Sequence, residues 1–195
     1  SSAAYTYSGS GTGLVINVTR SGGSYSVAIA NAGTGGYKVG ETLTVAGTAL
    51  GGATTANDAT VTINSVNNVA DTHTNPTQSG YGGSGTSATF NVTRDGGTYT
   101  VAISAAGSGY AAGETITIVG TQLGGATTAN DATITIGTVD GSGGITAATI
   151  AGTAVVTGTV ATAGIAGTAV TTGPIAGITI AGTGAAFGTI TKGML

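Results

Sequence analysis

The sequence predicts an all-β fold with two tandem small antiparallel modules, of sandwich or barrel-like form, followed by a tail built on a five-residue repeat. Two modules are predicted because residues 8–66 and 82–139 align almost without gaps, and LGGATTANDAT occurs unchanged in both. Strands are predicted because apolar and polar residues alternate within each copy. The expected divisions are a first module with an N-terminal arm at 1–66, a linker at 67–81, a second module at 82–140 and the repeat tail at 141–195.

Four strands are expected in each copy. In the first copy GLVINVT and SYSVAIA flank the turn RSGG, whose paired glycines can take the positive φ of a tight hairpin. The third and fourth strands are LTVAG and ATVTINSV, and LGGATTAND connects them. Two glycines followed by Asn-Asp are typical of such a loop. Turn chemistry in a duplicated fold therefore explains why the stretch is written twice.

The tail has a different period. Every fifth position from 145 to 190 is Ile or Val, with Ala185 as the exception, and a fifteen-residue repeat places IAGT at 150, 165 and 180. This spacing suits a β-solenoid within one chain or an interwound trimeric β-prism, and the prism is slightly favoured because association would bury more apolar area. The inward-facing assembly residues are predicted to be Ile150, Val155, Val160, Ile165, Val170, Ile175, Ile180 and Ile190.

Composition excludes several classes of partner. Charged residues are 6% of the chain, against about 25% in a typical soluble domain, and the net charge is −3. Four basic residues give no footprint for nucleic acid, and no apolar run reaches the roughly 18 residues of a spanning helix. The chain is expected to bind neither nucleic acid nor a membrane. It has no cysteine, so disulfides and thiolate metal sites are excluded.

Each module carries one arginine and one glutamate on predicted strands. Arg20 and Arg94 share face parity with inward apolar residues, and Glu41 and Glu114 do the same on the third strand. We therefore predict one structural ion pair at the end of each core, Arg20 with Glu41 and Arg94 with Glu114.

Asp58 and Asp131 are the candidate metal ligands, and Ca²⁺ is the cofactor that they suggest. A calcium site needs about six to eight oxygen ligands, and the repeated loop offers two or three, so turn chemistry is the favoured interpretation. His73, the single histidine, is interpreted as a solvated linker residue. Four tyrosines recur in register and are expected to pack at the module core and rim, with a sugar-binding surface as the alternative: Tyr25, Tyr37, Tyr99 and Tyr110.

The pattern N-V-T-R-x-G-G-x-Y-x-V-x-I, followed by G-E-T-[LI]-T-[VI] and L-G-G-A-T-x-A-N-D-A-T, resembles a repeated Gly/Thr-rich β module. Such modules are found in structural proteins of marine tailed bacteriophages, especially cyanophages. The resemblance covers about three fifths of the chain. It implies a structural role in the virion and brings no catalytic residues with it.

The resulting expectation is a non-enzymatic protein of a virion surface, in a fibre, an appendage or a capsid decoration. It would assemble with itself, a trimer being slightly favoured, and attach to other virion structural proteins; a cell-surface glycan is a further candidate partner. The alternative is a secreted extracellular filament or adhesin subunit in which residues 1–10 complete a neighbouring sheet by strand addition. Polysaccharide cleavage is disfavoured because no carboxylate pair has a suitable arrangement.

Overall fold

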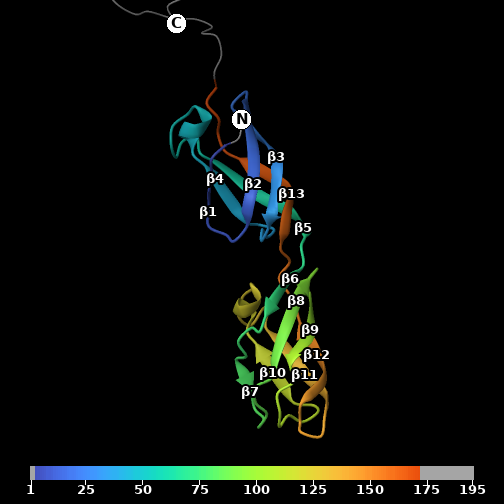
Figure 1. Ribbon diagram of the computed structural model, residues 1–195. Coiled ribbons are helices and arrows are strands. Elements are labelled where there is room, and N and C mark those ends of the chain that lie inside the picture. The colour runs from blue at the N-terminus through green and yellow to red at the C-terminus, as the bar shows by residue number, and fades with distance from the viewer. Residues whose placement is uncertain (1–2, 172–195) are drawn as a thin grey trace, which may run out of the picture.

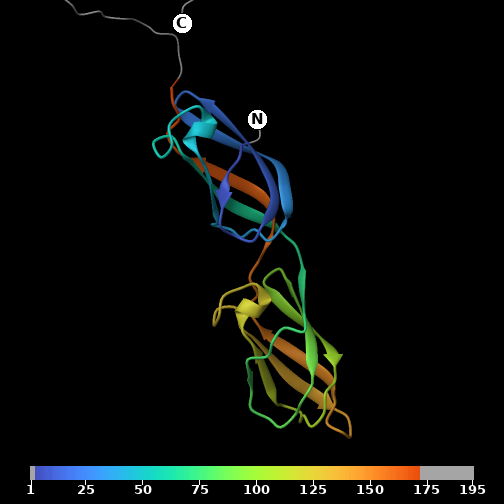
Figure 2. The same ribbon diagram turned by 60° about the vertical axis from the view of Figure 1, so that its left-hand side comes forward.

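The described part of the chain forms two β modules placed end to end (Figure 1). The computed structural model describes residues 3–171. The described residues contain no α-helix, only strands and two short 3-10 helices, which confirms the all-β prediction. The N-terminal residues and the last described residues both lie at the first module, and the second module forms the opposite end of the molecule (Figure 2).

The first module packs a four-stranded antiparallel sheet against a hairpin. The sheet has the order β1-β4-β5-β13 and the hairpin is β2-β3. Alternate residues of each strand face the space between them, and Ile16, Leu43 and Val61 are fully buried there. The elements are β1 (Thr6–Tyr7), β2 (Thr12–Ser21), β3 (Ser24–Gly35), β4 (Thr42–Val45), the 3-10 helix η1 (Gly47–Leu50), β5 (Ala59–Asn68) and β13 (Gly158–Ala166).

The second module repeats this design with one strand more. Its sheets have the orders β12-β11-β10-β7 and β6-β8-β9, and Phe90, Ile116 and Ile134 are buried between them. The predicted linker, residues 67–81, thus contains the end of β5 and two strands of the second module, β6 and β7. The elements are β6 (Asp71–Thr74), β7 (Gly80–Tyr81), β8 (Thr89–Asp95), β9 (Thr98–Ala105), β10 (Thr115–Ile118), the 3-10 helix η2 (Gly120–Leu123), β11 (Ala132–Val139) and β12 (Ile145–Gly152).

Both predicted hairpins are confirmed. Gly22 and Gly23 have φ values of 55° and 82° between β2 and β3, a conformation that other residues rarely adopt. Gly96 and Gly97 have φ values of 54° and 86° between β8 and β9. The local turn chemistry therefore fixes the same register in both modules.

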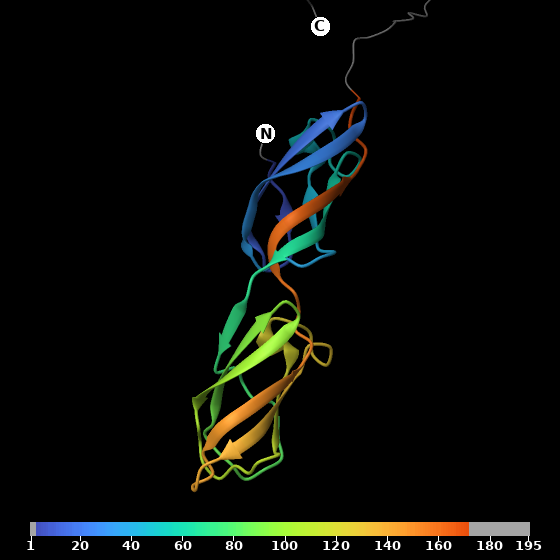
Figure 3. The same cartoon turned by 90° about the vertical axis from the view of Figure 1, so that its right-hand side faces the viewer.

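Residues 145–166 contain two strands, β12 and β13, which we call the return strands. β12 pairs with β11 in the second module, and β13 pairs with β5 in the first. The chain thus passes from the first module to the second and then comes back to complete the first (Figure 3). The first module is built from two separate parts of the sequence, and the whole second module lies between them in the chain.

β-Bulges explain the five-residue spacing. Ile145, Ala148 and Ile150 all contact the second core, and the register of β12 against β11 shifts between Ile145 and Ala148. A regular strand returns to one face every second residue, and a bulge makes one such step three residues long. The two steps together span five residues. β13 has the same pattern at Val160, Ala163 and Ile165.

The fifteen-residue repeat provides one return strand for each module. Ile150 lies opposite Ile134 of β11, and Ile165 lies opposite Val61 of β5. Gly152 and Gly167 then approach the neighbouring strand so closely that an added Cβ would lie 2.5 and 2.6 Å from a carbonyl oxygen. The repeat therefore marks the same strand position in both modules.

The predicted solenoid or prism is consequently wrong for residues 141–171, because sheet pairing with the modules replaces it. Of the predicted assembly residues, Ile150, Val160 and Ile165 pack on the module cores. Val155 and Val170 are half-buried in the segments that follow the return strands. Ile175, Ile180 and Ile190 lie outside the described residues.

Candidate functional site

Two chain segments cross the junction between the modules, and they are hydrogen bonded to each other. The outgoing segment leads from β5 to β6, and the returning segment leads from β12 to β13. The Val69 N–H donates to the Thr157 carbonyl oxygen at 3.0 Å, and the Thr157 side chain is buried. The Asn68 amide also donates to the Asp95 carboxylate, across the junction. The modules are therefore linked by more than one flexible connector.

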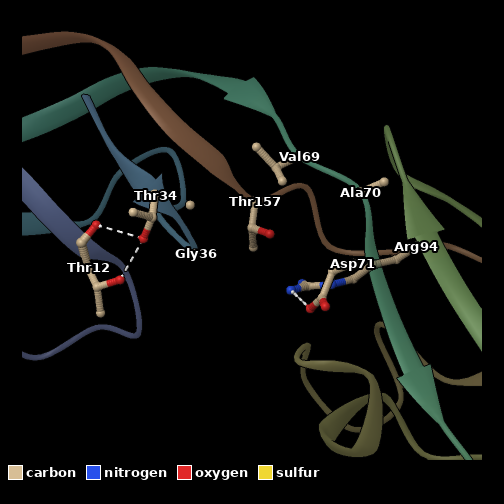
Figure 4. A pocket seen from close by; sticks show the side chains of 9 residues that line it. Thr12, Thr34, Gly36, Val69, Ala70, Asp71, Arg94 and Thr157 are labelled. Atoms are coloured by element: carbon tan, nitrogen blue, oxygen red, sulfur yellow. Dashed lines mark hydrogen bonds and ion pairs between the residues drawn. The ribbon is translucent and has the colours of Figure 1, made fainter. Parts of the chain in front are cut away.

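A surface pocket of about 280 Å³ lies at this junction (Figure 4). The first module contributes the ends of β2 and β3, and the second contributes Asp71 from β6 and Arg94 from β8. Figure 4 shows these two side chains side by side at one wall, opposite the threonine hydroxyls of the first module. The lining residues are Thr12, Thr34, Gly35, Gly36, Val69, Ala70, Asp71, Arg94 and Thr157.

Arg94 and Asp71 form the charged centre of the junction. The Arg94 Nη2 and Nε atoms lie 2.7 and 3.3 Å from the same carboxylate oxygen, Asp71 Oδ2. Arg94 is only 8% exposed, so its charge depends on this partner. His73 Nε2 lies 3.4 Å from Asp71 Oδ2, and burial lowers the pKa of His73 although Asp71 opposes that shift. The sequence predicted a solvated linker for Asp71 and His73, whereas both lie in β6. The alternation of Thr with Asp and His in DTHT was the one sign of a strand in this segment.

The predicted ion pairs are wrong in both modules. Within residues 3–171 neither arginine approaches its predicted glutamate within 4.0 Å. Arg20 Nη1 donates instead to the carbonyl oxygens of Leu50 and Gly51, at 3.1 and 3.3 Å. Strand parity predicts which face a side chain occupies, but not its position along the strand. The third strand of each module, β4 or β10, has four residues and is therefore about 13 Å long. The glutamate lies at the beginning of this strand, and the arginine lies near its other end.

The two glutamates accept hydrogen bonds that hold the turn before β4 and before β10. Glu114 accepts hydrogen bonds from the Ala111 N–H at 2.9 Å and from the Tyr81 hydroxyl at 2.7 Å. These two donors, the backbone N–H first, lower the pKa of Glu114. In the first module Glu41 accepts from the Lys38 N–H and the Tyr7 hydroxyl. Their role is local structure in both copies.

The repeated loop LGGATTAND is held by its own aspartate. Asp131 Oδ1 accepts from the Gly120 N–H at 2.7 Å and from the Thr128 N–H at 2.9 Å, while Asp58 Oδ1 accepts from the Gly47 N–H at 2.7 Å. The part of the chain that the structure describes contains no cluster of three or more His, Cys, Asp or Glu side chains that could hold a metal ion. The arrangement favours turn chemistry over a Ca²⁺ site.

The asparagine of this loop has a second role that the sequence did not reveal. Asn130 Nδ2 donates to the Thr153 carbonyl oxygen and Asn57 Nδ2 donates to the Thr168 carbonyl oxygen, both at 2.9 Å. Thr153 and Thr168 each lie just after a return strand. The identical loop thus fixes the end of the return strand in each module, and the shared IAGT sequences were the signal that connected them.

Replacing Asp131 by Ala is expected to destabilise the second module by about 1–3 kcal/mol, because two backbone N–H groups lose their acceptor. Asp131→Asn keeps an acceptor oxygen and should cost clearly less. Asp58→Ala should cost less than Asp131→Ala, since one N–H donates to Asp58. Chemical denaturation followed by circular dichroism measures these differences. Added Ca²⁺ should leave the unfolding midpoint of the unchanged protein where it is, and a Ca²⁺-dependent rise that Asp131→Ala abolishes would contradict the turn interpretation.

The four tyrosines pack as predicted at the core and rim. Tyr37, Tyr99 and Tyr110 are buried, and Tyr25 packs half-buried against the first core. The Tyr25 and Tyr99 hydroxyls donate to the carbonyl oxygens of Asn57 and Asn130 at 2.9 and 2.8 Å. These rings therefore hold the repeated loops.

Taken together, the fold and junction define a class of protein: two interlocked β modules whose charged side chains mostly hold loops and strands of the protein itself. No helix in residues 3–171 has the length and apolar character needed to cross a membrane. Comparisons of the chain with protein-family models, curated proteins and solved structures gave no match.

Proposed function

We propose that this protein is a non-enzymatic structural protein of a bacteriophage virion surface, serving as a rod-like segment of a fibre, an appendage or a capsid decoration. The double crossing of the junction is the observation that carries this proposal. Two domains joined by one linker usually move relative to each other. Two hydrogen-bonded segments divide a pulling or bending load between two backbones, which suits an exposed appendage.

The distribution of polar groups supports a structural role. Asp58, Asp131, Glu41 and Glu114 each accept hydrogen bonds from turns of their own module. The resemblance of the repeated module to virion structural proteins of tailed phages supports the location. Self-assembly and attachment to other virion proteins are the proposed mode of action, and a cell-surface glycan stays a predicted partner. The trimeric prism stays a prediction for residues 172–195 alone.

The alternative is an extracellular filament or adhesin subunit assembled by strand addition. The predicted donor, residues 1–10, is partly engaged within its own module, because β1 pairs with β4. Among residues 3–171 no strand pairs with the outer edge of β2 beyond Ile16, which favours strand addition of another kind, in which the first module receives a strand.

Purified particles test the proposed function. Phage particles and cell-surface filaments from a culture that produces the protein are separated on a density gradient, and an antibody against residues 3–171 is used for blotting and gold labelling. The proposal expects the protein in the particle fraction and gold on the particle surface. Label on host filaments supports the alternative, and protein found only in the soluble cell fraction contradicts both.

A further inference from the structure

The two modules differ in one strand. In the second module β6 pairs with β8, with Asp71 opposite Arg94 and Thr74 opposite Asn91. In the first module the corresponding sheet is the hairpin β2-β3, and no strand of the described residues occupies the place of β6. The Ala3 N–H donates to the Ile16 carbonyl oxygen at 3.1 Å, and beyond this point, from Asn17 to Arg20, no strand of residues 3–171 pairs with the outer edge of β2.

The open edge has the same residue types as the occupied one. Asn17, Val18, Thr19 and Arg20 correspond to the run Asn-Val-Thr-Arg at 91–94. Thr19 is exposed and Arg20 is half-buried, whereas their counterparts in the second module are covered further. A row of unpaired N–H and C=O groups on an edge strand is a template for another strand. The edge thus has the backbone geometry to receive one.

Charge complementarity indicates which kind of strand would fit. The guanidinium of Arg94 is paired through Nε and Nη2 with Asp71, a carboxylate from the incoming strand. The guanidinium of Arg20 has no carboxylate within 4.0 Å in residues 3–171 and contacts two carbonyl oxygens instead. An extended strand with an acidic residue opposite Arg20 would supply the missing counter-charge.

The fifteen-residue repeat independently indicates a further module. Two copies of IAGT end the two return strands, and the second copy belongs to the first module. A third copy begins at Ile180, outside the described residues, and Gly173 precedes it at the spacing of Gly158 before Ile165. The sequence thus contains one return-strand repeat more than the two described modules use.

We propose that the outer edge of β2 is a docking site for the connecting strand of a further module of the same kind, stacked on the free end of the first module. The strand runs antiparallel to β2 and places a carboxylate opposite Arg20, as β6 does for Arg94. This inference goes beyond the proposed function, because the same docking site would serve in a virion appendage and in an extracellular filament. Each added module would lengthen the rod by the same junction.

An N-terminal extension of the full chain tests this site. The Ala3 N–H donates to the Ile16 carbonyl oxygen as the Asn75 N–H donates to the Phe90 carbonyl oxygen, so Ala3 holds the place of Asn75. Replacing Ser1 and Ser2 by Val-Ala-Asp-Thr-His-Thr, the sequence of residues 69–74, therefore places the Asp of the extension opposite Arg20, as Asp71 lies opposite Arg94. Two matched extensions serve as controls: Val-Ala-Asn-Thr-His-Thr removes the charge, and Val-Ala-Asp-Thr-Pro-Thr lacks the N–H at the position of His73, which faces the neighbouring strand in the antiparallel ladder.

Hydrogen exchange and thermal unfolding are measured on the four proteins. The first extension is expected to slow amide exchange at Val18 and Arg20, whose N–H groups face the outer edge, about tenfold and to raise the midpoint by about 2–4 °C. The Asn extension should give a smaller gain and the Pro extension none. Equal exchange in all four proteins, or equal protection by the Pro extension, overturns the proposal. Either result leaves the particle-labelling test of the proposed function unaffected.

Discussion

A chain that ends at Thr157 is expected to lose the fold of its first module and keep that of its second. The truncation removes β13, which pairs with β5 along most of that strand's length. It also removes Val160, which is 2% exposed, and Ile165, which packs on the same core. Burial of each such side chain contributes about 1.5–3 kcal/mol, and the hydrogen-bond ladder of the strand is lost as well. A module of this size has only roughly 5–10 kcal/mol of stability in total.

Hydrogen exchange followed by mass spectrometry reads the two modules separately. In the chain ending at Thr157, amides of β4 and β5 should lose their protection, while those of β10 and β11 keep theirs because β12 is still present. A chain ending at Thr171 is the matched control and should protect both modules. Protection of β5 without β13 would show that the first module folds from residues 3–68 alone, and would remove the interlocked arrangement.

Local features of the fold could be predicted from the sequence, and the pairing of distant strands could not. The hairpins follow from alternation and from the glycine pairs, which act over a few residues. β13 pairs with a strand 90 to 106 residues earlier, and its five-residue spacing is equally compatible with a solenoid. Two of the three IAGT copies lie at the ends of β12 and β13, and this repeat was the sequence feature that pointed to one return strand per module.

The junction was harder to predict than the cores. Asp71 lies in a segment rich in Asn and Thr, whose composition resembles a linker, and its partner Arg94 is more than twenty residues away. Parity placed Arg94 correctly on the inward face, where it is buried. The acid that pairs with it depends on which strand lies alongside β8, and no local pattern contains that information.

Tyr37→Ala and Tyr110→Ala are expected to be the most damaging single substitutions, each costing about 3–5 kcal/mol in its own module. Both rings are buried, and their hydroxyls accept the backbone N–H of Leu14 at 3.1 Å and of Ala88 at 3.2 Å. The space around them cannot close easily, because glycines border each ring: a Cβ at Gly11 would lie 2.4 Å from the Tyr37 ring. Because glycines have no side chain, they cannot fill the cavity that removal of the ring would leave.

The same tyrosines also locate the beginning of each return strand. The Tyr37 N–H donates to the Gly158 carbonyl oxygen at 3.1 Å, and the Tyr110 N–H donates to the Gly143 carbonyl oxygen at 3.0 Å. A cavity at the ring should therefore loosen the return strand of that module first. The other strands of the module should lose their amide protection only when the whole module unfolds.

Phe variants separate packing from hydrogen bonding. Tyr37→Phe keeps the ring and removes only the acceptor for the Leu14 N–H, so we expect a cost of about 1–2 kcal/mol. Denaturant unfolding gives the total loss for each variant, and hydrogen exchange shows which module carries it. Tyr37→Ala should expose β5 and β13 and spare β11 and β12, and Tyr110→Ala should do the reverse. An Ala variant no less stable than its Phe counterpart would mean that the ring does not fill the core as its burial indicates.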